Sequence, residues 1–404
     1  MVRMRVLFVD DQPEVLQGLK RMLHSMKDEW DVGFARSGQE ALGLMEDKGA
    51  DVVVSDMKMP GMDGAQLLDE VMKRYPRVIR IILSGHSDQA SIMRSIGPTH
   101  QYLLKPCDAE TLKTTIARAL GLRRLLADES LKAVISQINA LPSLPSLYME
   151  IVAELRSSDS SLKKVGDIIS KDVGMTAKVL QLVNSAFFGV PRHIATPVQA
   201  VSLLGLDTIR ALVLSVQVFS EFEVVALPGF DIDVLWSHSV GVGAGAKALC
   251  KREQLDEKAV DDALLAGMLH DVGKLVLAAG VPEKSKEAIL LVQAKGMTHE
   301  GAENEVLGTT HAEVGGYLLG LWGLPDPIVE AVAYHHKPSK CIGRTLSPLT
   351  GVHVADIVER SLSDSGAGGA VPEVDTAYLA ELNAEGRLEK WSEICRSAVR
   401  GGGD

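Results

Sequence analysis

Hydrophobic positions follow two different patterns along this chain of 404 residues. Up to residue 122, short continuous apolar runs alternate with stretches whose apolar residues recur at helical spacing. The runs lie at 6–9, 51–55, 79–83 and 102–104, with a weaker one at 32–35, and the helical stretches include 14–26, 38–48 and 64–75. Continuous apolar runs are typical of parallel strands that are buried on both faces. The alternation predicts an α/β doubly wound parallel five-stranded sheet with five helices.

From residue 108 onward the pattern is helical. A stretch from Asp108 to about Ala140 shows little interruption, and an apolar stripe steps along it at Leu131, Val134, Ile138 and Leu141. The stripe fits either a helix that packs on its own domain or a signalling or dimer helix. After the Leu-Pro-Ser-Leu-Pro break at 141–145 we expect an all-α bundle, with helices at 146–157, 162–170, 175–185, 197–204 and 206–219. A Gly/Ser/Ala-rich loop at 361–371 precedes a last predicted helix at 375–399.

Composition narrows the class of protein. Hydrophobic residues make up 46% of the chain and charged residues 24%, which is typical of globular domains. No apolar run approaches the roughly 18 residues of a membrane span, so we expect no membrane insertion. The four cysteines are scattered without metal-site spacing, which favours reduced thiols and a cytoplasmic location.

Charge is distributed unevenly between the two halves. The net charge is −11, from 42 basic and 53 acidic residues. Residues 1–122 hold 16 basic and 17 acidic side chains, which leaves 26 and 36 for the remainder, a net charge of −10. An acidic second half is unsuited to a phosphate backbone, so we expect no nucleic-acid partner.

Reactive side chains fall at the ends of the predicted strands. These are Asp10, Asp11, Asp56, Ser84 and Lys105. Ligands of doubly wound sheets bind beyond the carboxyl ends of the strands. Carboxylates gathered there repel one another unless a hard cation such as Mg²⁺ lies between them. One carboxylate facing that cation can attack phosphorus, with lysine and serine placed for the phosphoryl oxygens.

The segments that carry these residues resemble the receiver domain of two-component response regulators, a flavodoxin-like fold. They are Val-Leu-Phe-Val-Asp10-Asp11, Val-Val-Val-Ser-Asp56-Met-Lys-Met-Pro60-Gly-Met-Asp63-Gly64, Ile-Ile-Leu-Ser84-Gly and Tyr102-Leu-Leu-Lys105-Pro106. The resemblance implies that a sensor histidine kinase phosphorylates Asp56. It also implies that Mg²⁺ is held by Asp10, Asp11, Asp56 and the backbone carbonyl of Lys58. Ser84 and Lys105 would contact the phosphoryl group, Tyr102 would be the switch aromatic, and the Lys105–Pro106 bond would be cis. Lys58 and His86 occupy variable positions of the family that tune the lifetime of the acyl phosphate in a direction the sequence leaves open.

Histidine and aspartate residues recur on the predicted helices of the second half. The candidate ligands are His238, His270, Asp271, His311, His335, His336 and Asp356. Such residues from several helices can build a metal centre in a bundle core. Asp271 could bridge two metals that activate water against a phosphodiester, with Lys274 as a candidate phosphate contact. The alternative is that each histidine is a separate hydrogen-bonded residue at a helix end.

The set is similar to the HD superfamily of metal-dependent phosphohydrolases, and its flanking segments closely resemble the HDOD family, the HD-related output domain. The segments are Leu-Pro-Ser-Leu-Pro145, Lys171-Asp-Val-Gly-Met-Thr-Ala-Lys-Val-Leu-Gln-Leu-Val-Asn184, Gln199-Ala-Val-Ser-Leu-Leu-Gly205, Ala266-Gly-Met-Leu-His270-Asp271 and His311-Ala-Glu-Val-Gly-Gly. HDOD domains are all-helical signalling modules without established catalysis, and many have lost the HD residues that this chain keeps. The related HD-GYP phosphodiesterases of cyclic dinucleotides continue past the paired histidines with an acidic residue and a Gly-Tyr-Pro loop. Here Lys337-Pro338 follows, and the chain contains no Gly-Tyr-Pro.

We therefore expect a response regulator with a receiver domain at 1–122, a connecting helix at 123–140, an HDOD domain at 141–340 and a C-terminal helical extension of that domain at 341–404. Phosphorylation of Asp56 would shift the packing of the helix at 108–140 through Ser84 and Tyr102. In the first hypothesis the output is a protein-interaction module that acts on an unknown downstream protein, in a monomer or a homodimer. In the second it is a metal-dependent phosphohydrolase that uses Fe, Mn or Zn.

Overall fold

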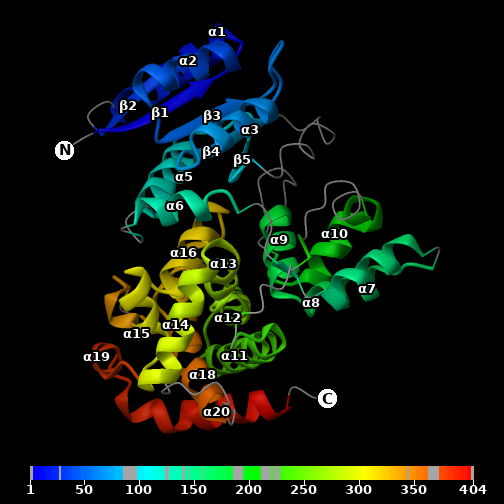
Figure 1. Ribbon diagram of the computed structural model, residues 1–404, viewed down its shortest axis with the longest axis vertical. Coiled ribbons are helices and arrows are strands. Elements are labelled where there is room, and N and C mark those ends of the chain that lie inside the picture. Colours follow the sequence, from blue (N-terminus) through cyan, green and yellow to red (C-terminus); the bar gives the residue numbers. More distant parts are fainter. Residues whose placement is uncertain are drawn as a thin grey trace.

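The structure is a computed structural model that describes residues 3–26, 29–84, 98–122, 126, 128–138, 142–143, 145–157, 159–184, 194–210, 220–221, 227, 229–343, 345–362 and 373–401. A sheet flanked by helices forms one end of the molecule, and a larger body of helices forms the other (Figure 1). One continuous hydrophobic core runs from a face of the sheet through the helical body, and a second core covers the opposite face of the sheet.

The sheet confirms the predicted fold class. Its five strands are all parallel, in the order β2-β1-β3-β4-β5. The strands are β1 (Met4–Val9), β2 (Trp30–Ala35), β3 (Val52–Asp56), β4 (Ile79–Ser84) and β5 (Gln101–Leu104). Every residue of β3 and β4 is buried, as continuous apolar runs require.

Four helices of this domain are described: α1 (Pro13–Met22), α2 (Gly38–Lys48), α3 (Gly64–Arg74) and α5 (Ala109–Leu122). The predicted first helix is shorter than expected, because the chain turns into a 3-10 helix at His24–Met26. The predicted helix between β4 and β5 lies outside the described residues. A capping box between Asp63 and Gln66 begins α3. Gly64 follows the cap because a Cβ atom there would lie 2.2 Å from the carbonyl oxygen of Asp56.

The predicted continuous helix at 108–140 is wrong. The described residues form α5 and a separate helix α6 (Glu129–Ile135). The physical reason is a new cap, since the side chain of Asp128 accepts a hydrogen bond from the backbone N–H of Leu131 at 3.1 Å. Of the predicted stripe, Leu131 is buried in the continuous core and Ile138 packs against it, whereas Leu141 lies outside the described residues, so the described part of the stripe packs within the molecule.

The helical body also fits the prediction in its main features. Its helices are α7 (Pro145–Arg156), α8 (Leu162–Ser170), α9 (Val173–Asn184), α10 (Pro197–Arg210), α11 (Ile232–Arg252), α12 (Glu257–Leu269), α13 (Val272–Gly280), α14 (Pro282–Lys295), α15 (His299–Leu307), α16 (His311–Leu321), α17 (Asp326–Tyr334), α18 (Pro348–Leu362), α19 (Thr376–Glu381) and α20 (Leu388–Gly401). A two-residue parallel pair, β6 (Pro142–Ser143) with β7 (Ser220–Glu221), was not predicted.

Three predicted helices of the body differ from the structure. The helix predicted at 375–399 is divided into α19 and α20, because Asn383 adopts a left-handed φ of 52° between them. The helices predicted at 197–204 and 206–219 meet in α10, which kinks at Gly205, while residues 211–219 lie outside the described part. Residues 363–372, which hold most of the predicted loop, lie outside it as well.

The stretch Glu257–Gly280 is long and apolar enough to cross a membrane, contrary to the expectation that no run approaches that length. In the structure 72% of its apolar 18-residue window is buried inside the protein, and the stretch is divided into α12 and α13 at His270 and Asp271. Core helices of globular proteins share this composition, so the stretch is weak evidence for a membrane.

The sheet domain and the helical body share a polar interface. The Arg118 guanidinium on α5 donates to the carbonyl oxygen of Leu324 and pairs with Asp326 at 2.5 Å. Arg80 on β4 is fully buried and donates to the carbonyl oxygen of Ser136, just after α6, at 2.5 Å. These contacts tie β4, α5 and α6 into one interface (Figure 1).

Two candidate functional sites

The first candidate site lies at the carboxyl edge of the sheet. Asp10 follows β1, Asp56 ends β3, Ser84 ends β4 and Lys105 follows β5, so the predicted residues meet as expected from the topology. The Lys105 ammonium lies 2.5 Å from Asp10 Oδ2 and also donates a hydrogen bond to Asp56 Oδ1. One lysine therefore bridges two carboxylates that would otherwise repel each other.

Burial and charge tune these groups in opposite directions. Burial raises the pKa of Asp56, while the hydrogen bond from Lys105 counteracts part of that rise. Burial alone would lower the pKa of Lys105, but its hydrogen bonds to Asp10 and Asp56 outweigh burial and raise it. The backbone N–H of Lys58 donates to Asp56 Oδ2 at 2.8 Å, which orients the carboxylate.

The residues fit a magnesium ion. Asp11 Oδ1 is a buried oxygen without a hydrogen-bond partner among the described residues. Such an oxygen beside Asp10 and Asp56 is the kind of hard ligand that Mg²⁺ takes. The carbonyl ligand predicted at Lys58 stays a prediction, and His86 lies outside the described residues.

Tyr102 and Ser84, the expected readout residues, are both buried. Tyr102 lines a cavity of about 240 Å³, together with Gln181 of α9 and Trp322 beyond α16. Tyr102 also belongs to the second hydrophobic core, on the sheet face opposite the core that is shared with the helical body. The Lys105–Pro106 peptide bond is cis, as expected.

The second candidate site lies inside the helical body. His238 comes from α11, His270 and Asp271 from the break between α12 and α13, His311 from the start of α16, and Asp356 from α18. His335 and His336 directly follow α17. The structure brings all seven predicted side chains together, and it places His238 and His335 around the same His270–Asp271 pair.

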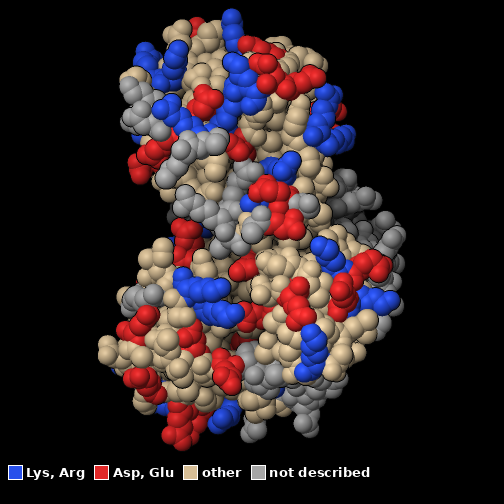
Figure 2. Space-filling model, turned by 60° about the vertical axis from the view of Figure 1, so that its left-hand side comes forward, with Lys and Arg blue, Asp and Glu red and all other residues tan. Residues whose placement is uncertain are grey.

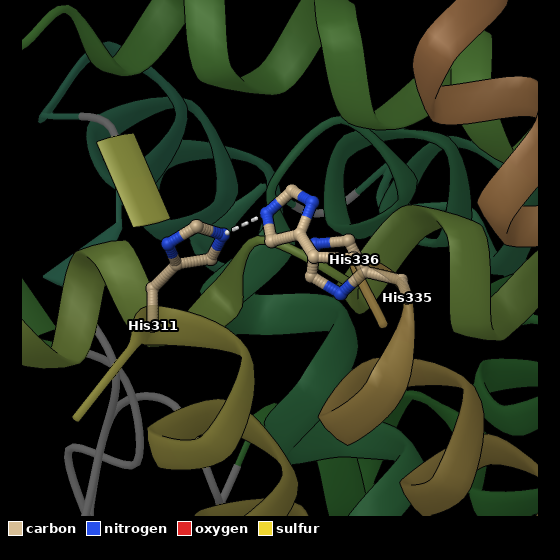
Figure 3. A group of neighbouring side chains, drawn as sticks. All are labelled: His311, His335 and His336. Carbon is tan, nitrogen blue, oxygen red and sulfur yellow. Dashed lines mark hydrogen bonds between the residues drawn. The ribbon is translucent and has the colours of Figure 1, made fainter. Parts of the chain in front are cut away.

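The ligand atoms of this centre converge closely. His238 Nε2 lies 3.1 Å from His270 Nε2 and 3.1 Å from Asp356 Oδ1. His311 Nε2 lies 3.0 Å from Asp271 Oδ1 and 3.0 Å from His336 Nε2. Figure 3 shows the rings of His311, His335 and His336 turned toward one another.

Outer hydrogen bonds hold the imidazoles with Nε2 inward. His238 Nδ1 bonds to Glu359, and His311 Nδ1 lies 2.6 Å from Glu303 Oε2. The Nδ1 atoms of His270 and His335 lie 2.7 and 2.8 Å from the backbone carbonyl oxygens three residues earlier. Outer acceptors of this kind orient metal-binding histidines in proteins.

Three buried ligand atoms have no hydrogen-bond partner among the described residues: Asp271 Oδ1, His335 Nε2 and Asp356 Oδ2. An unsatisfied buried polar atom is costly, so ligand atoms of this kind that face one centre fit a cation site. Imidazole and carboxylate ligands together suit Fe, Mn or Zn, so the donor set fits the predicted metals.

Two cationic side chains lie against the carboxylates. The Lys274 ammonium donates to Asp271 Oδ2 at 2.6 Å, so the candidate phosphate contact is paired with a candidate metal ligand. Arg360 donates to the same oxygen at 3.0 Å and to Asp356 Oδ1 at 2.7 Å. The sequence analysis missed Arg360, although its spacing of four residues from Asp356 on one helix was a signal.

Electrostatics reflect this crowding. Burial alone would raise the pKa of Asp271, but His270, Lys274 and Arg360 hold it well below its usual range. Burial alone would lower the pKa of His311, yet Glu303 and Asp271 raise it to about 9.

Glycine permits the close approach that builds the centre. A Cβ atom on Gly273 would lie 1.9 Å from the carbonyl oxygen of His311, so the close approach of α13 to the start of α16 requires glycine at this position. On the other side, Lys337 pairs with Glu300 at 2.6 Å and Pro338 begins a 3-10 helix. Lys337 and Pro338, which stand where the HD-GYP pattern has its acidic residue and Gly-Tyr-Pro loop, therefore form the segment that follows the paired histidines.

Comparisons with known proteins agree with both halves of the chain. Residues 6–117 match the response regulator receiver domain, and residues 141–338 match the HDOD domain. An uncharacterized protein of Treponema pallidum (strain Nichols) is 27% identical over 205 residues, 51% of this chain and 39% of that protein. The hydrogenase transcriptional regulatory protein HoxA of Cupriavidus necator is 33% identical over 125 residues, 30% of this chain and 25% of that protein. The matches span less than half of either relative.

Two solved structures are similar to parts of this chain. The MmoQ response regulator from Methylococcus capsulatus is 21% identical, with a TM-score of 0.45 and coverage of 63% of this chain and 98% of that one. A putative phosphohydrolase from Shewanella amazonensis is 23% identical, with a TM-score of 0.37 and coverage of 68% and 96%. The two domain matches, in this order along one chain, identify the family. The chain is a response regulator with an N-terminal receiver domain and a C-terminal HDOD domain.

Proposed function

We propose that this response regulator stores its signal as a phosphoryl group on Asp56, received from a sensor histidine kinase. The observation that supports this most strongly is the Asp10–Lys105–Asp56 bridge beside the unpartnered Asp11 Oδ1. The arrangement provides one attacking carboxylate, one cation for the product and oxygen ligands for a metal.

The chain's own residues account for the chemistry of transfer. The Asp56 carboxylate attacks phosphorus, and the bond from phosphorus to the donor's imidazole nitrogen breaks. Lys105, already hydrogen-bonded to Asp56, pairs with a phosphoryl oxygen. Mg²⁺, when bound by Asp10, Asp11 and Asp56, neutralises the phosphoryl charge.

Phosphorylation by a small phosphodonor with Mg²⁺, followed by intact mass spectrometry, tests this proposal. We expect one phosphoryl group per chain, and none in Asp56→Asn. Asp69→Asn is the matched control, because Asp69 is a partly exposed carboxylate of α3 that pairs with Lys73, away from the strand ends. Labelling that persists in Asp56→Asn would refute the assignment.

The interface between the domains supports the output as an interaction module. Tyr102 lines the cavity beside α9, and Arg118 fixes α5 to the segment before α17. A change at Asp56 that moves Ser84 and Tyr102 would therefore shift how the HDOD domain packs on β5 and α5. The changed surface would act on a downstream signalling protein in the cytoplasm, in a monomer or a homodimer.

Nucleic acid is not among the proposed partners. The face in Figure 2 intersperses basic and acidic side chains, and the chain carries a net charge of −11. A phosphate backbone favours a continuous basic surface instead.

We also propose that the HDOD centre binds a transition metal. A phosphohydrolase is the second candidate function, favoured by the convergence of seven ligands and by Lys274. Against rapid turnover stands the burial of His270, Asp271, His311 and His335, each at most 1% exposed. With added Mn²⁺ we expect slow or no hydrolysis of cyclic dinucleotides. Brisk hydrolysis that is lost in His270→Ala would make the output an enzyme.

A further inference from the structure

Each of the two candidate carboxylate ligands of the HDOD centre has one oxygen that accepts a hydrogen bond from Lys274 or Arg360 and one oxygen that does not. Asp271 Oδ2 accepts from Lys274 and Arg360, and Asp356 Oδ1 accepts from Arg360. Asp356 Oδ2 is buried without a hydrogen bond from any described residue, and Asp271 Oδ1 has no cationic Lys or Arg partner but only the His311 ring nitrogen, 3.0 Å away. The centre therefore has two sides. On the balanced side, Asp271 Oδ2 and Asp356 Oδ1 are paired with Lys274 and Arg360. On the other side, Asp271 Oδ1 and Asp356 Oδ2 face no cationic lysine or arginine among the described residues.

The histidines divide in the same way. On the balanced side, His238 has Glu359 on Nδ1, and its Nε2 lies 3.1 Å from Asp356 Oδ1. On the other side, His335 Nε2 has no hydrogen-bond partner among the described residues. His311 Nε2 lies 3.0 Å from Asp271 Oδ1, the oxygen that neither Lys274 nor Arg360 contacts. Unsatisfied nitrogen and oxygen atoms thus face each other.

We infer that this centre takes a single divalent cation and that the Arg360 guanidinium occupies the position of a second one. The cation is ligated by Asp271 Oδ1, His311 and His335. His336 and Asp356 lie beside the position of this cation, and His336 Nδ1 is 3.7 Å from Asp356 Oδ2. The inference rests on the proposed metal centre and narrows it.

Charge counting supports one cation rather than two. Four carboxylates surround the ligands, those of Asp271, Asp356, Glu303 and Glu359. Two cations oppose them, Lys274 and Arg360, which leaves two negative charges when the imidazoles are neutral. One divalent ion neutralises this charge, whereas two would leave two positive charges in a buried site, which is strongly unfavourable.

Arg360 is suited to act as a built-in cation. Its planar guanidinium donates through Nε to Asp356 and through Nη2 to Asp271, so it spans the two carboxylates as a bridging metal would. An arginine keeps its charge at every accessible pH, and its side chain is only 20% exposed. It is therefore a permanent part of the centre.

The number and coupling of bound Mn²⁺ ions test this inference in the full-length chain. An Asp11→Asn background removes the receiver's own ion. Metal analysis gives the ions per chain, and electron paramagnetic resonance distinguishes an isolated Mn²⁺ from a spin-coupled pair. We expect one isolated ion in the wild-type centre, two coupled ions in Arg360→Gln, and one ion in Arg360→Lys, which keeps the charge. Arg387→Gln, which removes an exposed arginine paired with Glu253, is the matched control and should bind one ion.

Each outcome decides the matter. A coupled pair in the wild-type centre, or a single ion in Arg360→Gln, overturns the inference and leaves the metal centre standing. No ion in any variant, including after refolding with Mn²⁺, overturns the proposed metal centre and this inference with it. If Arg360→Gln does not fold, the wild-type spectrum still decides between one ion and a coupled pair.

Discussion

The receiver site and the HDOD centre solve the same electrostatic problem in different surroundings. In each, one cationic side chain bridges two carboxylates, Lys105 in the receiver and Arg360 in the HDOD domain. In each, at least one carboxylate oxygen has no hydrogen bond from the described residues. The surroundings differ, because the receiver residues sit at strand ends whereas the HDOD ligands project from helices into a shared interior.

Burial separates what the two sites can do. The Asp56 side chain is 11% exposed and Lys105 is 25% exposed, whereas Asp271 and Asp356 are at most 1% exposed. The more open receiver edge suits the proposed exchange of a phosphoryl group at Asp56. The closed interior of the HDOD domain suits the proposed metal ion, which would be retained there.

Removing one carboxylate from each site should produce the largest difference between the two domains. Asp271→Ala leaves Lys274 and Arg360 without their shared partner, which should cost ~3–5 kcal/mol in the free energy of unfolding of the HDOD domain. Asp56→Ala should change the receiver by less than ~1 kcal/mol, since Lys105 keeps Asp10 and a carboxylate repulsion is lost. Hydrogen exchange in the presence of a chelator reports each domain separately. Equal losses in the two domains would contradict the comparison.

Metal loading should sharpen the contrast. A divalent ion at 100 times its dissociation constant stabilises the state that binds it by ~2.7 kcal/mol. We expect Mn²⁺ to raise the unfolding free energy of the HDOD domain by this amount, and a chelator to reverse it. His335→Ala, which removes one of the unsatisfied ligand atoms, is the variant in which the gain should vanish. If Mn²⁺ still raised the unfolding free energy of His335→Ala, the ion would have to bind at another place.

Lys105, which is half-buried, and Lys178, which is buried, test how carboxylate partners affect the pKa of a lysine. Lys105 has two, whereas Lys178 has the Trp322 ring at 4.8 Å and no ion pair within the described part of the chain. Burial lowers the pKa of Lys178 to about 7. Because the unfolded chain then binds more protons above pH 7, this lysine makes stability rise with pH, by ~2 kcal/mol between pH 7 and 9.

Urea unfolding of Lys178→Met at both pH values checks that slope. The variant should be more stable than the parent at pH 7, and its advantage should shrink by about 2 kcal/mol at pH 9. Lys113→Met, a lysine on the surface of α5, is the control and should show a constant difference. A constant difference for Lys178→Met would mean that this lysine is charged in the folded state.

The smallest expected effect concerns the contact between the domains. Arg118→Ala removes an ion pair with the exposed Asp326, which should cost at most ~1 kcal/mol of stability. Its effect on coupling should be easier to see, as altered hydrogen exchange of α5 and α6 on phosphorylation of Asp56. Identical protection of these helices with and without a phosphoryl group, already in the parent protein, would contradict coupling through this interface.

The receiver was the more predictable half, because its strands and site residues are neighbours in the sequence. Its strands are continuous apolar runs, and its site residues directly follow them in sequence. The break between α5 and α6 was missed because residues 123–128 keep helical composition, and only the cap by Asp128 marks the new helix.

In the HDOD domain the histidines and aspartates were identified, but their partners were not. Glu303 and Glu359 lie on helices whose sequences look like ordinary solvated faces, and their role appears only when α15 and α18 fold against the histidines. Gly273 could not be distinguished from other glycines either, because its close approach to His311 depends on how α13 crosses α16.

Arg80 has a consequence for how this chain can be divided. Its guanidinium is satisfied by backbone carbonyls on both sides of the proposed boundary at residue 122, Pro98 at 2.5 Å and Ser136 at 2.5 Å. A receiver excised at Leu122 would keep a buried arginine and lose one of its acceptors. The smallest portable unit therefore extends through α6 to about Ser136, and a chimera that grafts this receiver onto another output should take α6 along.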